Sequence, residues 1–376
     1  MDDRQYVTWI EAGEERSALW RSENGSRAPQ RVLVADDRMK ADIAFRYACE
    51  GTAILWRGDY QNARQLLQAI ARRIDHRKRR ARQPESRLQA FHLYRQEQLQ
   101  RARILGMLLI PLDAEYVVPL RRAPDVRDAC LNAYGPSAGD SLVALRELLG
   151  VIGAHEWRKK GVAIPVLGDR IHPHYGVFSP VRGEYLELLA QAPLAGRRRA
   201  FDIGTGTGVI AALLAKRGVP EVIATDLDVR AIACAQENIQ RLGLAGQVRV
   251  MQADLFPPGK ADLVVCNPPW LPASANSRLD QAVYDPEHRM LKGFLQGLCG
   301  HLEVGGEGWL ILSDLAEHLG LRSREQLLQM IADAGLHVSE KLDIKPQHPR
   351  TMDTQDALHE ARRAETTSLW ILTPAA

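Results

Sequence analysis

The chain carries the stretch Phe201-Asp202-Ile203-Gly204-Thr205-Gly206-Thr207-Gly208-Val209-Ile210, followed by the apolar run Ala211-Ala212-Leu213-Leu214-Ala215. An apolar run, a glycine-rich turn and a second apolar run predict a strand, a tight turn and a helix. Three glycines at alternate positions remove Cβ atoms from the turn, so a ligand can approach the backbone closely. A helix that begins at Gly208 directs its free N–H groups and positive dipole end toward that ligand. The stretch therefore predicts a small-molecule site at the carboxyl end of a strand.

The sequence beyond this stretch continues to alternate between strand and helix patterns. Strands are predicted at residues 221–225, 248–251, 263–266, 309–312, 336–338 and 369–372, and helices at 228–242, 287–301 and 323–334. Asp228 suits the N-cap of the first of these helices, and Gly243 follows its end. Consecutive strand–helix units predict a doubly wound, seven-stranded, Rossmann-like α/β sheet that binds its ligands at the carboxyl edge.

A length of 376 residues favours two domains. We expect an N-terminal accessory domain for substrate recognition over residues 1–160 and a catalytic domain over residues 161–376. Residues 1–30 are weakly patterned and predict a loose arm or a short helix. The rest of the first domain predicts a mixed α/β fold. Its strands are expected at 31–36 and 52–56 and within 104–119, and its helices at 38–49, 60–74, 124–134 and 141–159.

A basic segment lies within this first domain, at residues 71–103. It holds eleven Lys and Arg residues against three acids, with Phe91, His92 and Tyr94 among them. One interpretation is a solvated helix face, since runs of charge are usually solvated. The other is a patch for the phosphates of RNA or of the ribosome surface. The aromatic residues suit either base stacking or the buried side of the helix.

The composition does not predict a disulfide-rich, metal-binding or membrane-spanning protein. A hydrophobic content of 45% with 25% charged residues is typical of a globular protein in water, and the net charge is only +3. Five scattered cysteines without a CxxC pair predict neither a disulfide framework nor a zinc site. His172 and His174 flank a proline and lack a third ligand, so we expect no metal. Without a long apolar run or a signal-like start, we expect a cytoplasmic protein.

The spacing of the glycines narrows the choice of ligand. Gly204-x-Gly206-x-Gly208 differs from the G-x-G-x-x-G pattern of dinucleotide sites, and no Gly-Lys-Ser/Thr of a phosphate loop follows. Asp226 ends the next predicted strand, where a carboxylate can accept bonds from both hydroxyls of a ribose. Asp254 ends the third strand. It suits an adenine amine, with Leu255 against the ring, and equally well an ordinary turn.

Asn267-Pro268-Pro269-Trp270 follows the fourth predicted strand directly. Two prolines fix an extended turn that lacks backbone donors, so its free groups are acceptors. The Asn267 amide oxygen and the Pro268 carbonyl form a rigid pair that suits a planar –NH2 group. Trp270 offers a flat wall for a planar base or amide.

With these motifs, residues 172–376 resemble a class I S-adenosylmethionine-dependent methyltransferase. The Asn-Pro-Pro-Trp motif is similar to the (Asn/Asp)-Pro-Pro-aromatic box of enzymes that methylate an amide or exocyclic amino nitrogen. Residues 176–185 resemble the segment before the glycine loop in release-factor and ribosomal-protein glutamine methyltransferases and in ribosomal-RNA guanine-N2 methyltransferases. The chain has Trp270 where the glutamine enzymes have Tyr, and Ser179–Glu184 where they have Pro-Arg-Pro-x-Thr-Glu. Its longer N-terminal domain is more similar to that of the ribosomal-RNA enzymes.

The resemblance implies S-adenosyl-L-methionine as cofactor and an N-methyltransferase activity. The acceptor it implies is a macromolecule of the translation apparatus, either a protein glutamine or a ribosomal-RNA base. A small-metabolite methyltransferase and a non-catalytic RNA-binding protein are the alternatives. The implied catalytic residues are Asn267, Pro268, Pro269 and Trp270. The implied cofactor-binding residues are Asp202, Gly204, Thr205, Gly206, Gly208, Asp226, Leu227, Asp254, Leu255 and Asn267. The acceptor itself and the oligomeric state stay open.

Overall fold

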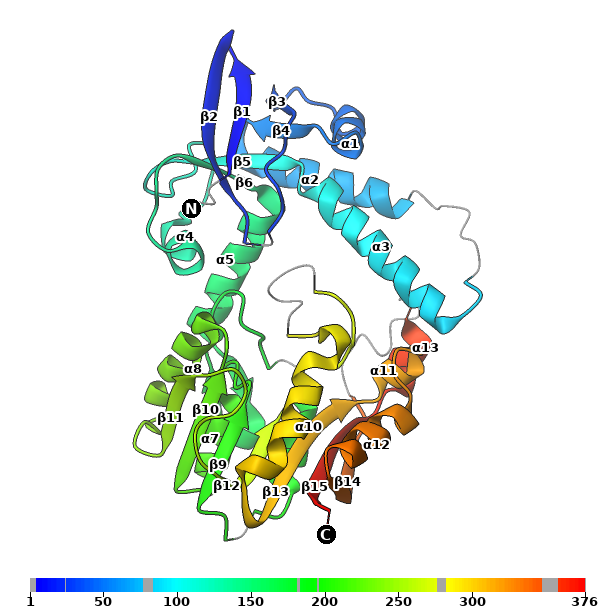
Figure 1. Cartoon of the computed structure of the whole chain (residues 1–376). Helices are drawn as coiled ribbons and strands as arrows, with labels where there is room; N and C mark the ends of the chain where they lie inside the picture. Colours follow the sequence, from blue (N-terminus) through cyan, green and yellow to red (C-terminus); the bar gives the residue numbers. More distant parts are fainter. Residues whose placement is uncertain are drawn as a thin grey trace. The chain divides into compact units, whose positions relative to one another are not determined.

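A computed structural model describes residues 5–23, 25–76, 84–180, 183–194, 196–275, 282–346 and 358–375 of the chain (Figure 1). The chain divides into two compact units. The first holds Met1–Glu85 and His92–Glu156, and the second holds Ser86–Phe91 and Trp157–Ala376. The division between Glu156 and Trp157 lies close to residue 160, where the sequence places the domain junction.

The first unit is built on a six-stranded sheet with the order β1-β2-β6-β5-β4-β3. Its strands are β1 (Tyr6–Glu11), β2 (Glu14–Arg21), β3 (Val32–Ala35), β4 (Ala53–Trp56), β5 (Leu108–Leu112) and β6 (Ser141–Ala144). Its helices are α1 (Ala41–Cys49), α2 (Tyr60–His76), α4 (Arg127–Tyr134) and parts of α3 (Arg87–Leu105) and α5 (Leu145–Lys160). The strands β3, β4 and β5 are parallel, whereas β5 pairs with β6 antiparallel.

The prediction for residues 1–30 was wrong, because β1 and β2 form an antiparallel hairpin. Val7 and Trp9 are buried and alternate with exposed neighbours, which is the period of a strand. Ala12 and Gly13 turn the chain with φ angles of 53° and 83°, the left-handed pair that a two-residue hairpin loop needs. The alternation of apolar and polar residues that predicts a strand was therefore present in the sequence, but it covers only a few residues.

Two further boundaries in the first unit differ from the predictions. The strand expected from residue 104 begins only at Leu108, because Ile104 and Leu105 complete α3. Ser141–Ala144, which were assigned to a helix, form strand β6 between β2 and β5. An apolar run of four residues does not distinguish a buried strand from the first turn of a helix. The region nevertheless has the mixed α/β character that the sequence predicts.

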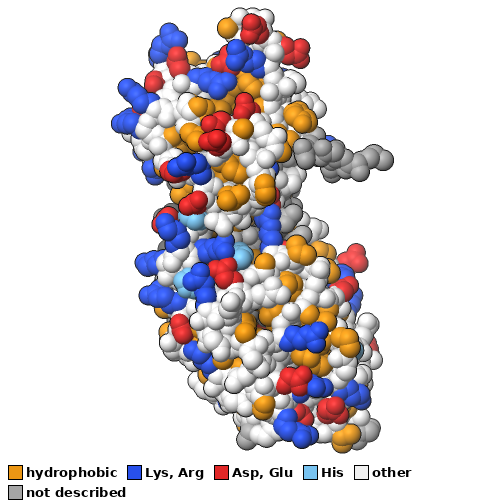
Figure 2. Space-filling view, turned by 90° about the vertical axis from the view of Figure 1, so that its left-hand side faces the viewer, with side chains coloured by type: hydrophobic (Ala, Val, Ile, Leu, Met, Phe, Trp, Pro, Cys, Tyr) orange, Lys and Arg blue, Asp and Glu red, His pale blue; other side chains and the backbone are white. Residues whose placement is uncertain are grey.

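The basic segment is only partly described, since residues 77–83 lie outside the described ranges. Arg73 pairs with Asp42, and Arg101 pairs with Asp75. Phe91 is buried, which favours the packing interpretation for that ring. On the face drawn in Figure 2, Lys and Arg side chains are interspersed with Asp, Glu and hydrophobic side chains.

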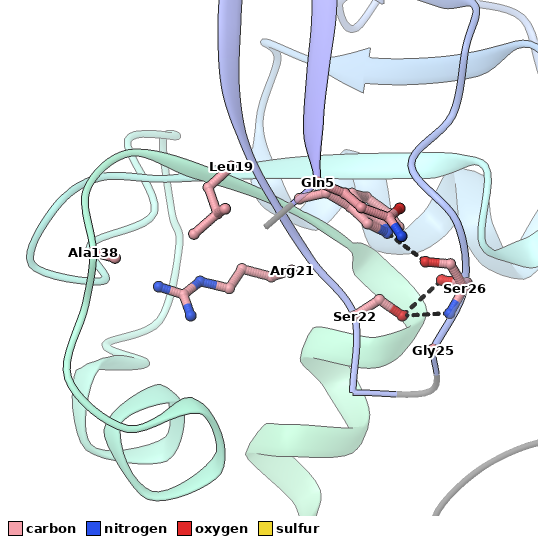
Figure 3. Close-up of a pocket in the computed structure, with 8 residues that line it drawn as sticks. Gln5, Leu19, Arg21, Ser22, Gly25, Ser26 and Ala138 are labelled. Carbon is pink, nitrogen blue, oxygen red and sulfur yellow. Dashed lines mark hydrogen bonds between the residues drawn. The ribbon is translucent and has the colours of Figure 1, made fainter. Parts of the chain in front are cut away.

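The first unit also contains a cavity of about 280 Å³ beside the end of β2 (Figure 3). Arg21 and the two serines Ser22 and Ser26 line it, and Arg21 extends away from the serines. The guanidinium carbon of Arg21 lies 5.5 Å from the ring centre of Tyr116 and 5.9 Å from that of Tyr134. These cation–π contacts stabilise the charge of Arg21 inside the unit.

The second unit is a seven-stranded sheet with the order β11-β10-β9-β12-β13-β15-β14. Its strands are β9 (Arg199–Ile203), β10 (Glu221–Asp226), β11 (Val248–Gln252), β12 (Ala261–Cys266), β13 (Leu302–Ser313), β14 (Leu336–Ile344) and β15 (Thr367–Pro374). All pairs are parallel except those of β15, which is antiparallel to both β13 and β14. A small hairpin of β7 (Val162–Ile164) and β8 (Asp169–Ile171) precedes the sheet. This hairpin directly follows the domain junction that the sequence predicts at residue 160.

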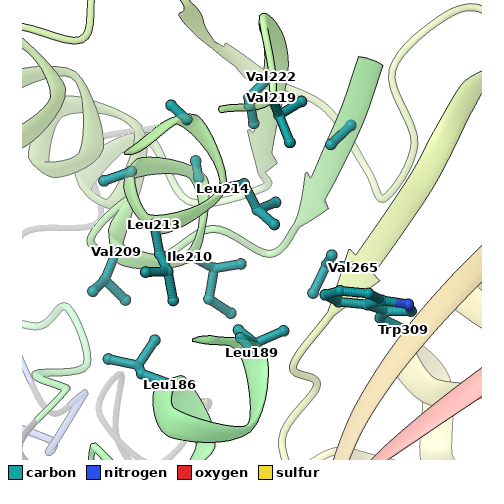
Figure 4. Close-up of a cluster of buried hydrophobic side chains, with 14 of the residues drawn as sticks. Leu186, Leu189, Val209, Ile210, Leu213, Leu214, Val219, Val222, Val265 and Trp309 are labelled. Carbon is teal, nitrogen blue, oxygen red and sulfur yellow. The ribbon is translucent and has the colours of Figure 1, made fainter. Parts of the chain in front are cut away.

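Helices cover both faces of this sheet. They are α6 (Glu184–Gln191), α7 (Val209–Lys216), α8 (Val229–Arg241), α10 (Arg289–His301), α11 (Leu315–His318), α12 (Arg324–Asp333) and α13 (His359–Ala364). Side chains of α6 and α7 pack with β9 and β12 on one face, as Figure 4 shows for Leu189, Leu214 and Val265. Phe201 and Ile203 point to the other face, toward α10 and α12. The predicted doubly wound sheet is confirmed.

The helix caps also follow the sequence. The Asp228 side chain accepts a hydrogen bond from the Arg230 backbone, and Gly243 follows α8 with a φ angle of 70°. Among the described residues, we find no helix with the length and apolarity that a membrane crossing requires.

Candidate active site at the carboxyl edge of the sheet

Strand register brings three of the predicted site residues together. Ile203 of β9 pairs with Thr225 of β10 on one side and with Cys266 of β12 on the other. The next residue of each strand is therefore Gly204, Asp226 and Asn267, respectively. All three strands are parallel, so these residues lie at the same edge of the sheet. The glycine loop, the acid and the Asn-Pro-Pro-Trp motif thus form one site.

The glycine loop adopts a backbone that requires glycine. Gly204, Gly206 and Gly208 have φ angles of 71°, 55° and 80°, values that residues with a Cβ atom rarely adopt. A Cβ atom at Gly208 would lie 3.2 Å from the Cα of Ala235, and one at Gly204 would overlap the Cε of Met290. A Cβ at Gly206 would meet nothing within 4 Å. The loop therefore packs tightly at both ends and is open at its centre.

Asp202 holds the loop from inside β9. Its Oδ2 accepts hydrogen bonds from the Thr205 hydroxyl at 2.6 Å and from the Ala211 amide at 3.0 Å. The side chain is fully buried, and burial raises the pKa of Asp202 to about 7. The other oxygen, Oδ1, is buried without a partner among the described residues. A buried acceptor without a donor lowers stability and indicates a ligand or water at that atom.

Replacing Asp202 by asparagine is expected to stabilise the free protein. The folded carboxyl has a raised pKa, so between about pH 4 and pH 7 it keeps a proton that the unfolded chain releases. The unfolding free energy of the wild type therefore falls as pH rises through this window, by up to about 4 kcal/mol. Asparagine does not titrate, so the unfolding free energy of Asp202→Asn does not fall in this window. In denaturant unfolding, the variant should therefore be more stable than the wild type at pH 8 and should have no such advantage at pH 4. An equal difference at both pH values would contradict this role of the charge.

Asp226 supports the loop from the neighbouring strand. Its Oδ2 accepts a hydrogen bond from the Gly206 amide at 3.0 Å, and its Oδ1 accepts one from the Asp228 amide at 2.9 Å. Burial raises the pKa of Asp226 above its ordinary value. Each carboxylate oxygen has lone pairs left for a further donor. Asp228 caps α8, so the capping role does not account for Asp226.

The other predicted cofactor residues lie around this edge with differing contacts. Asp254 pairs with Arg289 at 2.7 Å, and both side chains are more than half exposed. Leu255 has a φ angle of 73°, and its carbonyl accepts a bond from the Thr225 hydroxyl at 2.5 Å. Leu227 is exposed. A strained non-glycine residue such as Leu255 is typical of a functional site, and these assignments stay predictions.

A hydrogen bond between two residues of the Asn-Pro-Pro-Trp motif fixes its conformation. The indole Nε1 of Trp270 donates a hydrogen bond of 2.9 Å to the Oδ1 of Asn267. An indole nitrogen only donates, so this bond fixes the orientation of the Asn267 amide and leaves its oxygen one further acceptor position. Pro268 is buried, and no described residue donates to its carbonyl oxygen. The two predicted acceptor groups are therefore both available.

We expect Trp270→Phe to reduce turnover about 3- to 10-fold, because it removes one hydrogen bond that orients Asn267. An aromatic ring remains at this position, so we expect cofactor affinity not to change. Trp309→Phe is a matched control, since the indole of Trp309 bonds Glu307 and lies in the core. Turnover measured with labelled cofactor should fall for the first variant only, and equal rates in both would contradict the role of the bond.

A segment that the sequence leaves unassigned, as a lid or a plain connector, is bonded to the Asn-Pro-Pro-Trp motif. Asp285 is 4% exposed and accepts bonds from the amides of Met290 and Leu291 at the start of α10. Its own amide donates to the carbonyl of Leu271, the residue after Trp270. Leu271 also forms a bridge with Tyr284. Only an acid before a helix signalled this role in the sequence, and part of the preceding polar loop, residues 276–281, lies outside the described residues.

The two histidines have structural partners. His172 donates its amide to the Asn238 side chain at 2.8 Å, and His174 pairs with Glu237 at 2.7 Å. Burial works against the charge of Glu237, but bonds from His174, Arg241 and Arg158 prevail and lower its pKa to about 2. Within the described ranges, no group of three metal-ligating side chains is present. Of the segment 176–185, Val181 and Arg182 lie outside the described residues.

Comparison with known proteins shows which families this chain is similar to. Residues 170–319 match the family model of the methyltransferase small domain. The chain is 34% identical over 150 residues to the release factor glutamine methyltransferase of Moorella thermoacetica, covering 34% of this chain and 53% of the relative. It is 28% identical over 160 residues to a putative protein N5-glutamine methyltransferase of Methanocaldococcus jannaschii, covering 40% and 80%. It is 38% identical over 88 residues to the tRNA1(Val) (adenine(37)-N6)-methyltransferase of Bacteroides thetaiotaomicron, covering 22% and 37%. The chain thus spans about half the length of the first relative.

S-adenosyl-L-methionine is the cofactor that the sequence predicts, and the residues present fit it. The cofactor carries an ammonium group and a ribose, both of which are hydrogen-bond donors. The unpartnered Oδ1 of Asp202 and the carboxylate of Asp226 are acceptors at the loop. The open centre at Gly206 leaves space for a ligand against the backbone. Asp202, Asp226 and the glycine loop would hold the cofactor.

Proposed function

We propose that this chain, which belongs over residues 170–319 to the class I S-adenosylmethionine-dependent methyltransferases, is an N-methyltransferase. Its acceptor is an amide or exocyclic amino nitrogen of a translation-related macromolecule. The observation that carries the proposal is the Asn-Pro-Pro-Trp motif directly beside the glycine loop, across adjacent strands. Its two free groups, the Asn267 oxygen and the Pro268 carbonyl, are both acceptors. A planar –NH2 group has the two donors that match them.

The chemistry divides between cofactor and protein. The cofactor supplies a methyl group already activated by its sulfonium, so the protein contributes mainly orientation and electrostatics. Asp226 and the backbone of the glycine loop position the cofactor. Asp202 fixes the loop through Thr205 and the start of α7.

The acceptor nitrogen is a poor nucleophile because its lone pair is delocalised. Two hydrogen bonds, to Asn267 and Pro268, turn that lone pair toward the methyl group. As the nitrogen gains positive charge, its N–H groups become stronger donors and the two oxygens stabilise it. The product cation is acidic and loses its proton to water, so the site needs no strong base.

The named relatives support the choice of acceptor. Two are glutamine methyltransferases and one is a tRNA adenine-N6 methyltransferase, so each acts on an amide or exocyclic amino nitrogen. We assign the recognition of the macromolecule to the first unit, whose segment 71–103 is rich in positive charge. With an acceptor of this class, we propose a cytoplasmic location.

The test is to incubate the purified chain with labelled cofactor and an extract from cells that lack the enzyme. We expect label in the protein or RNA fraction, and none with Asn267→Ala. Label confined to the small-molecule fraction would support a metabolite methyltransferase instead. Absence of cofactor binding by calorimetry would contradict the proposal as a whole.

A further inference from the structure

An arginine is buried without a partner next to the proposed active site. Arg322 lies between α11 and α12 and is only 3% exposed. Its amide bonds the carbonyl of Ala316, but its Nε and Nη2 atoms have no hydrogen-bond partner among the described residues. Arginine stays ionised in proteins. A buried, unpaired charge costs several kcal/mol, so the free protein carries an unfavourable group here.

The acids around Arg322 are already engaged elsewhere. Both oxygens of Asp285 accept amide bonds at the start of α10. Glu317 accepts a bond of 2.8 Å from Arg324. These two carboxylates act on Arg322 only through space. Among the described residues, the Nε and Nη2 donors of Arg322 therefore have charged neighbours but no acceptor.

A half-buried histidine shares this environment. Burial, and then the positive charges of Arg322 and Lys292, lower the pKa of His288 to about 4. His288 is therefore neutral at pH 7, and its ring N–H can act as a donor. Arg322 and exposed Lys292 are two cations that both act on His288. Two such cations suit an anionic ligand.

The segment that holds this histidine is bonded to the catalytic motif. Asp285 bonds Leu271, directly after Trp270, and Met290 lies against the glycine loop at Gly204. Between them, Glu287 and His288 have φ angles of 56° and 60°. Two successive left-handed residues with side chains are strained, and such strain clusters at ligand sites. The segment that carries His288 is therefore bonded to the motif at which the acceptor is proposed to lie.

We propose that Arg322 binds a backbone phosphate of an RNA acceptor, next to the base that is methylated. This inference rests on the proposed function and narrows its acceptor to RNA. The planar guanidinium can bond two phosphate oxygens at once, and neutral His288 can donate a further bond. A phosphodiester also carries the negative charge that suits the two cations Arg322 and Lys292 beside His288.

The test compares wild type, Arg322→Gln and Arg199→Gln. Arg199 is a matched control, because it pairs with Glu221 at the opposite edge of the sheet. Thermal unfolding is followed with inorganic phosphate, a short RNA and an acidic peptide, at constant ionic strength. We expect phosphate and RNA to raise the melting temperature of wild type and Arg199→Gln by about 2–4 °C and that of Arg322→Gln by much less. Without ligand, Arg322→Gln should melt at or above the wild-type temperature.

Methyl transfer to RNA gives a second readout. We expect Arg322→Gln to lower kcat/KM for RNA about 10- to 100-fold, with cofactor affinity unchanged. Stabilisation by the acidic peptide in place of RNA, or equal stabilisation of all three proteins, would overturn the inference. If Arg322→Gln does not fold, Arg322→Lys keeps the charge without the planar fork, and it should retain only part of the phosphate effect. An equal effect in that variant would also overturn the inference. Cofactor binding is measured separately, so a failure of the proposed function is distinguishable from a failure at Arg322.

Discussion

Replacing Asn267 by alanine is expected to lower the rate of methyl transfer about 100- to 1000-fold. The Asn267 oxygen is held by Trp270, and in the proposed mechanism it accepts a hydrogen bond from the nitrogen on which positive charge develops during transfer. Removing this oxygen leaves the methyl donor in place but takes away one of the two hydrogen-bond acceptors proposed to hold the amine that is methylated. The loss should therefore appear in kcat, measured with labelled cofactor, and cofactor affinity should change less than about twofold.

Asn267→Asp is the matched control for this variant. A carboxylate has the same shape, still accepts the Trp270 indole bond and still faces the developing cation. We expect it to retain a larger part of the activity than alanine does. Wild-type turnover in Asn267→Ala would remove the residue from the mechanism, and an equal loss of cofactor binding would reassign it to the cofactor site.

The second large effect is expected at Asp226. Asp226→Ala should weaken binding of S-adenosyl-L-methionine about 100-fold, because charge-assisted bonds to both ribose hydroxyls are lost. The bond that holds the Gly206 amide is lost as well. Calorimetry on the free enzyme measures the affinity directly.

Asp228→Ala provides the comparison, since the two acids lie two residues apart. Asp228 caps α8 through the Arg230 amide, so its loss should lower stability by about 1 kcal/mol and leave affinity nearly unchanged. If both variants lost affinity to the same extent, the general geometry of the loop, and not a ribose contact, would explain the effect.

The second unit could be predicted closely because its signals are local. Glycines in the loop, the Asp228 cap and the apolar strands each determine structure within a few residues, and strand register then aligns Gly204, Asp226 and Asn267. The first unit was less predictable. Its hairpin rests on two buried residues, Val7 and Trp9, and its strand β6 has only four residues. Such short patterns do not distinguish strand from helix or loop.

Within the site, the missed residues act through packing between distant segments. Met290 lies against Gly204, and Asp285 bonds Leu271, yet nothing in their own sequence reports these contacts. The sequence does not distinguish Arg322 from the many exposed arginines, and only the structure shows that it is buried. Asp254 also forms an ion pair with Arg289, which the spacing of the two residues in the sequence does not indicate. Chemistry-bearing motifs are thus readable from sequence, whereas their surroundings depend on the fold.

The central claim is that the Asn-Pro-Pro-Trp motif directs methyl transfer to nitrogen. The most direct test is to isolate the labelled product, hydrolyse it and identify the methylated atom by mass spectrometry. The account predicts methyl on an amide or exocyclic amino nitrogen, formed by the wild type and lost in Asn267→Ala. A methyl group on carbon or oxygen, or the same nitrogen product from Asn267→Ala at the wild-type rate, would contradict it.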